Sequence, residues 1–122
     1  MTKVSVFPAI KNLLKENVTL YGFVPPDARP PYVVYEERGQ TWGFPDVTRG
    51  TVSFGLKILS TYKGAQEINQ MIALLKGKLE GCEVTLEPRL KGLFRFIHQD
   101  TEFKNDAITR EAVLEFQLMV RK

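Results

Sequence analysis

A dense group of prolines early in the chain, in the segment YGFVPPDARPPYVVYE, restricts most strongly how this sequence can fold. The group consists of Pro25, Pro26, Pro30 and Pro31. Each proline fixes φ at about −65°, lacks a backbone N–H and pushes the preceding residue towards extended geometry. Neither a helix nor a central strand can cross such a segment. We therefore expect a stiff, extended connection that leads into a strand at 32–38, where YVVYEER is rich in β-branched and aromatic residues.

Two segments have the apolar periodicity of amphipathic helices. The first begins after Ser5, a suitable N-cap, tolerates Pro8 in its first turn and ends near Asn17. The second spans 65–80, and Gly81 suits the left-handed position that commonly follows a helix. The apolar face of the second helix is formed by Ile68, Met71, Ile72, Leu75 and Leu79.

The strands are indicated by alternation of apolar and polar residues. It is clearest at 51–61 and 110–122, and 93–103 reads as a further strand that the turn sequence KNDA joins to the last one. The glycine-rich segment 38–50 is interpreted as a long loop or hairpin tip. We expect one α+β domain over residues 1–122, with a mainly antiparallel sheet of about four to five strands and two helices packed on one face.

The charge balance is weakly basic. The chain has 17 Lys and Arg against 14 Asp and Glu, a formal net charge of +3. The basic excess lies between Lys57 and Arg95, where both signs are interspersed, so we expect a solvated mixed surface rather than a nucleic-acid footprint. No segment has the length and hydropathy of a membrane span, and the N-terminal sequence lacks the apolar core of a secretory signal. We expect a cytosolic protein without a membrane partner.

Catalytic chemistry is poorly supported by the residue types. The chain has one cysteine, Cys82, and one histidine, His98, and neither lies in a recognisable nucleophile motif. His98, Asp100 and Glu102 alternate and would share one side of a strand, where a divalent metal could bind. A strand that enters an exposed turn also becomes polar at its end, and this is the interpretation we favour. We expect no catalytic residue, no metal and no cofactor.

Trp42 and Phe44 lie in the predicted glycine-rich loop. Large aromatic residues there reduce solubility unless they fold back or bind a partner. Three alternatives stay open: the two rings pack on the domain's own core, they contact another protein, or they stack on bases while Arg49 binds a phosphate.

The order of these features resembles that of short tail completion proteins of phages and prophages, which are similar to the tail terminators of long-tailed, non-contractile phages and gene transfer agents. The resemblance covers nearly the whole chain. It is carried by VFPAIKNLLKEN, by the proline-rich lead into a Tyr-Val-Val strand, by TVSFGLKILST, by GAQEINQMIALLKGKLEG and by LFRFIHQDTEFKNDAITREAVLEFQLMV.

This resemblance implies a structural virion protein rather than an enzyme, located in the virion tail after assembly in the bacterial host cytoplasm. It implies a ring of about six copies that caps the tail tube, ends polymerisation of the tube protein and forms the joint to the head–tail connector protein. DNA that passes through the lumen would be contacted only weakly. A head–tail neck adaptor or stopper protein, or a small nucleic-acid-binding module, is the alternative.

A ring subunit needs contact patches that repeat around an axis, and a stiff segment loses little chain entropy on binding. We therefore expect the interface to include the proline segment, the aromatic loop and the last hairpin, which would lie near the lumen. The residues are Tyr21, Phe23, Pro25, Pro26, Arg29, Trp42, Phe44, Arg49, Lys104, Asn105, Asp106 and Arg110.

Overall fold

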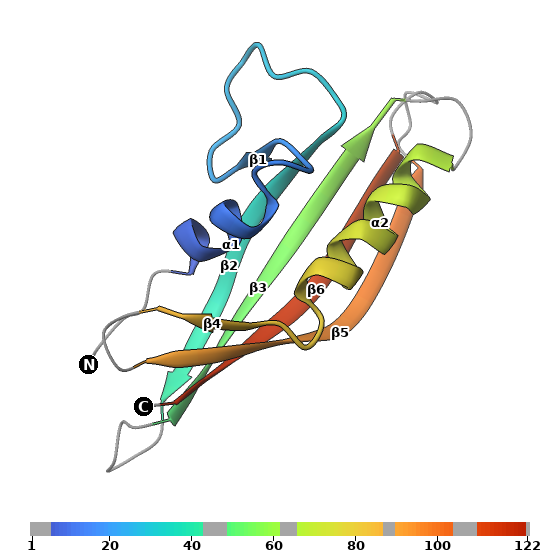
Figure 1. Cartoon of the computed structure of the whole chain (residues 1–122). Helices are drawn as coiled ribbons and strands as arrows, with labels where there is room; N and C mark the ends of the chain where they lie inside the picture. The colour runs from blue at the N-terminus through green and yellow to red at the C-terminus, as the bar shows by residue number, and fades with distance from the viewer. Residues whose placement is uncertain (1–5, 43–48, 62–65, 87–89, 104–109, 122) are drawn as a thin grey trace.

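The computed structural model of the chain describes residues 6–42, 49–61, 66–86, 90–103 and 110–121. Two helices lie over one face of a long, twisted sheet (Figure 1). In chain order the elements are α1 (Phe7–Leu14), β1 (Leu20–Tyr21), β2 (Tyr32–Trp42), β3 (Arg49–Ser60), α2 (Gln66–Leu79), β4 (Glu83–Thr85), β5 (Lys91–Phe103) and β6 (Arg110–Arg121).

The sheet has the strand order β1-β2-β3-β6-β5-β4. The β1–β2 pair is parallel, whereas β2–β3, β3–β6, β6–β5 and β5–β4 are antiparallel. The α+β class agrees with the prediction. The expected four or five strands in a mainly antiparallel sheet were wrong, because within the described residues the sheet has six strands and is mixed. The two additional strands, β1 and β4, are two and three residues long, too short to show an alternating pattern.

The core lies between the helices and one face of the sheet. Phe54 of β3 is opposite Phe116 of β6, and their rings stack with centroids 5.7 Å apart. The ring of Phe94 on β5 meets Phe54 edge-on at 5.9 Å. Burial of such side chains stabilises the fold by about 1.5–3 kcal/mol each. The helices add to the same core Ile10, Leu14, Ile68, Ile72, Leu75 and Leu79.

The helix ends agree only in part with the sequence signals. The N-cap of α1 is Val6, which makes no side-chain capping hydrogen bond, so the expected cap at Ser5 was wrong; Ser5 itself lies outside the described residues. Pro8 does lie in the first turn, where its missing N–H costs nothing. After α2, Gly81 adopts a left-handed φ of 74°, as predicted.

The predicted loop at 38–50 is partly strand. β2 continues to Trp42, which is opposite Gly50 of β3, and only 43–48 lies outside the described residues. The register shifts between Glu37 and Gly39. The loop interpretation rested on the glycines and the proline of the segment, and pairing with β3 outweighs that local preference up to Trp42.

Candidate functional site

The proline-rich segment forms an arm, defined here as residues 22–31, between the parallel strands β1 and β2. Leu20 is opposite Val33, so strand pairing holds the two ends of the arm together. Within the arm the backbone N–H of Ala28 donates to the carbonyl of Pro25 at 3.1 Å. Figure 1 shows the arm looping out beyond the body of the sheet. The prolines therefore stiffen a loop whose two ends are held together by strand pairing. The sequence had predicted only an extended connection that leads into β2.

The arm presents an aromatic side chain to solvent. Phe23 is 87% exposed, and it is a residue that the sequence indicated as an interface candidate. At the base of the arm the rings of Tyr21 and Tyr32 meet edge-on with centroids 5.5 Å apart. An exposed aromatic on an anchored segment is typical of a protein contact. The other interface candidates predicted at the arm and its base are half-buried or exposed: Tyr21, Pro25, Pro26 and Arg29.

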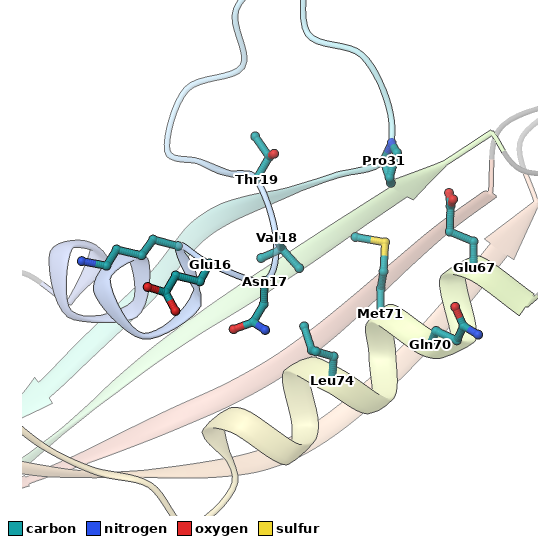
Figure 2. Close-up of a pocket in the computed structure, with 10 residues that line it drawn as sticks. Glu16, Asn17, Val18, Thr19, Pro31, Glu67, Gln70, Met71 and Leu74 are labelled. Atoms are coloured by element: carbon teal, nitrogen blue, oxygen red, sulfur yellow. The ribbon is translucent and has the colours of Figure 1, made fainter.

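A hollow of about 440 Å³ lies between the end of α1, the base of the arm and α2. Val18, Met71 and Leu74 supply its apolar lining, and Figure 2 shows Met71 and Leu74 rising from α2 towards the segment that precedes the arm. Glu67 stands at its rim and accepts a hydrogen bond of 2.5 Å from the hydroxyl of Ser60, which fixes the first turn of α2 to the end of β3. The hollow is thus built on rigid elements.

The predicted interface residues divide between two ends of the sheet. Arg110, the first residue of β6, is opposite Ser60 and therefore lies at the end from which the arm extends. Arg49 begins β3 at the other end, opposite Arg121, and is exposed. Trp42 is the last residue of β2 at that same end; its side chain is not described. Phe44, Lys104, Asn105 and Asp106 lie outside the described residues.

Two cationic neighbours of Arg49 were missed by the sequence analysis. Lys91 and Arg121 are opposite each other on β5 and β6, and Arg121 is opposite Arg49 on β3. The three residues are far apart in the sequence, and only the strand register brings them together. The sequence placed Arg49 in a predicted loop and Lys91 before the predicted strand 93–103, and it indicated neither the longer strands nor their order.

Of the groups considered for chemistry, Cys82 is half-buried, whereas His98 and Asp100 are exposed. His98 Nε2 lies 3.2 Å from Asp100 Oδ2, and both side chains are more than half exposed; the side chain of Glu102 is not described. Within the described parts of the chain, no three His, Cys, Asp or Glu residues are grouped so that they could hold a metal ion. Neither described helix has the length and apolar character needed to span a membrane.

Among the described residues, Tyr35 is the one whose side-chain pKa is clearly shifted by its surroundings. Its ring packs between Phe7 and Phe54, with centroid distances of 5.4 and 5.5 Å. Burial raises the pKa of Tyr35 well above its usual range, and the negative charge of the Glu37 carboxylate raises it further. The phenol therefore stays neutral at physiological pH, which suits a core residue.

Comparisons with known proteins identify the kind of molecule this chain is similar to. The sequence model of the family described as "Tail completion protein gp17" matches residues 2–121. Among solved structures, a chain of the particle described as "Virion of native gene transfer agent (GTA) particle" superposes with a TM-score of 0.72 at 15% sequence identity. The superposition covers 93% of this chain and 84% of that one, and at this identity it shows a shared fold. No curated protein sequence matches the chain.

Proposed function

Because the chain belongs to the tail completion protein gp17 family, we propose that it caps the end of a phage or prophage tail tube as a ring of about six copies. The family assignment supports a structural role and a location in the virion tail. In this role the ring ends polymerisation of the tube and provides the joint to the head connector. The observation that carries the proposal is the match over residues 2–121, which includes every described helix and strand.

The distribution of exposed groups supports a protein that joins two different neighbours. The anchored arm with Phe23 extends from one end of the sheet, and the exposed cations beside Arg49 lie at the other. A subunit of a closed ring also needs two unlike patches that meet around the axis. DNA in the lumen would be contacted weakly, since charges of both signs are interspersed.

Tube length provides the direct test. Purified tube protein would be polymerised with and without the chain, and tubes would be measured by negative-stain imaging. We expect added protein to stop elongation and to appear as a ring at the tube end. Tubes that continue to elongate at saturating protein would contradict the proposal, and binding to the connector without binding to the tube would favour the neck adaptor or stopper alternative.

The proposed ring of about six copies is tested by measuring the mass of the purified chain by light scattering. Mass would be measured across a concentration series, with imaging of the same samples. We expect assembly to about six copies either in solution or upon addition of tube ends. A chain that stays monomeric in both settings would overturn the ring.

A further inference from the structure

A row of three cations crosses the sheet at the end opposite the arm. Arg49, Arg121 and Lys91 stand in register on β3, β6 and β5, and all three are exposed. Directly opposite Cβ atoms in antiparallel strands are about 4.5–5.5 Å apart, and like charges in such pairs are destabilising. Among the residues that the structure describes, none of the three forms an ion pair with a carboxylate. This arrangement favours an anionic partner that would relieve the repulsion.

The cations border a hollow of about 660 Å³. Its apolar lining includes Leu93 and Met119, which are opposite each other on β5 and β6 and remain 40% and 46% exposed. One carboxylate, Glu83 on the short strand β4, also lines the hollow, so positive charge is in excess. The site therefore combines a positively charged rim with an exposed apolar floor.

From this combination we infer that the hollow binds an acidic protein segment in which an apolar side chain is flanked by carboxylates. The apolar side chain would lie on Leu93 and Met119, where a flexible methionine adapts to its shape. The flanking carboxylates would accept charge-assisted hydrogen bonds from Arg49, Lys91 and Arg121. A nucleic-acid phosphate backbone would use the cations but leave the apolar floor exposed, so a protein segment fits the site better.

This inference rests on the proposed function for the source of the segment, which would be a neighbouring protein of the tail. The contact would be distinct from that of the arm, because the hollow and the arm lie at opposite ends of the sheet. The two ends would thus recognise partners by different chemistry, an aromatic anchor at one end and charge with an apolar floor at the other.

The test is a selection from a random peptide display library against the purified full chain at physiological salt. We expect enrichment of sequences that combine carboxylates with one apolar residue. A synthetic peptide of that type should lose affinity by at least about tenfold in the double variant Lys91→Gln with Arg121→Gln. Met119→Gln should also weaken it, whereas Lys78→Gln, an exposed lysine on α2, should leave it unchanged.

Three results would overturn the inference: no enrichment, enriched peptides without carboxylates, or binding that the double variant retains. Competition by duplex DNA at physiological salt would assign the cations to nucleic acid instead. Thermal unfolding of each variant confirms that the fold is intact. The tube-length assay separates the two proposals, since a chain that caps tubes but selects no acidic peptide would refute only this inference.

Discussion

A Cβ atom placed on Gly92 would lie only 2.6 Å from Cδ1 of Leu118, a fully buried side chain of the core. Leu118 cannot move away cheaply, because protein cores are close-packed. We expect Gly92→Ala to lower the free energy of unfolding by about 1–3 kcal/mol, as overpacking of a core does. Urea denaturation measures the change, and an unchanged midpoint would show that the core has unexpected free space at this position.

Gly77 is a second glycine, and there we expect substitution by alanine to stabilise the fold instead of destabilising it. It lies on the exposed side of α2, and among the described residues a Cβ there would meet no atom within 4 Å beyond the neighbouring backbone of the helix. Glycine in a helix interior is less favourable than alanine by about 0.5–1 kcal/mol. Gly77→Ala should therefore raise the free energy of unfolding by roughly that amount. The same denaturation experiment checks it, and a loss of stability would contradict the exposed placement.

Tyr35 should make the fold sensitive to alkaline pH. Its pKa is raised in the folded chain, so its contribution to stability is fully present below the usual value of about 10 and is lost as the pH rises above it. We expect Tyr35→Phe to reduce this alkaline loss, and Glu37→Gln to reduce it in part because one cause of the raised pKa is removed. Unfolding free energies measured across the alkaline range would test both, and identical pH dependence in all three chains would rule the mechanism out.

The central strands and the second helix could be predicted because their periodicity reflects burial on one side only. Val52, Phe54 and Leu56 lie on the face of β3 that carries the helices and are buried, and their period of two shows in the sequence even though Gly55 between them is buried as well. In α2 the spacing of Ile68 and Ile72 follows the same logic at the helical period.

The remaining strands and surfaces could not be predicted, because they depend on which strands pair with each other, and no local sequence pattern encodes strand pairing. β1 is a strand because Leu20 meets Val33 across a parallel pair. The second half of β2 is a strand because it pairs with β3, although its glycine-rich sequence favours a loop. The candidate contact surfaces show the same difference between local sequence signals and strand pairing. Phe23 was indicated by its aromatic character beside prolines, whereas the neighbours Arg121 and Lys91 required the register of three strands.

Phe23 provides the sharpest test of the arm as a contact surface. Its side chain is 87% exposed, so Phe23→Ser should change the free energy of unfolding by no more than about 0.5 kcal/mol. If the ring anchors a neighbour, the same change should weaken ring formation or tube capping by about tenfold or more, since exposed aromatics dominate many interfaces. Phe23→Leu keeps an apolar anchor and should retain most of the activity. Normal assembly by Phe23→Ser would exclude Phe23 as an anchor, and a loss of stability in that variant would instead mean that the ring packs on its own domain.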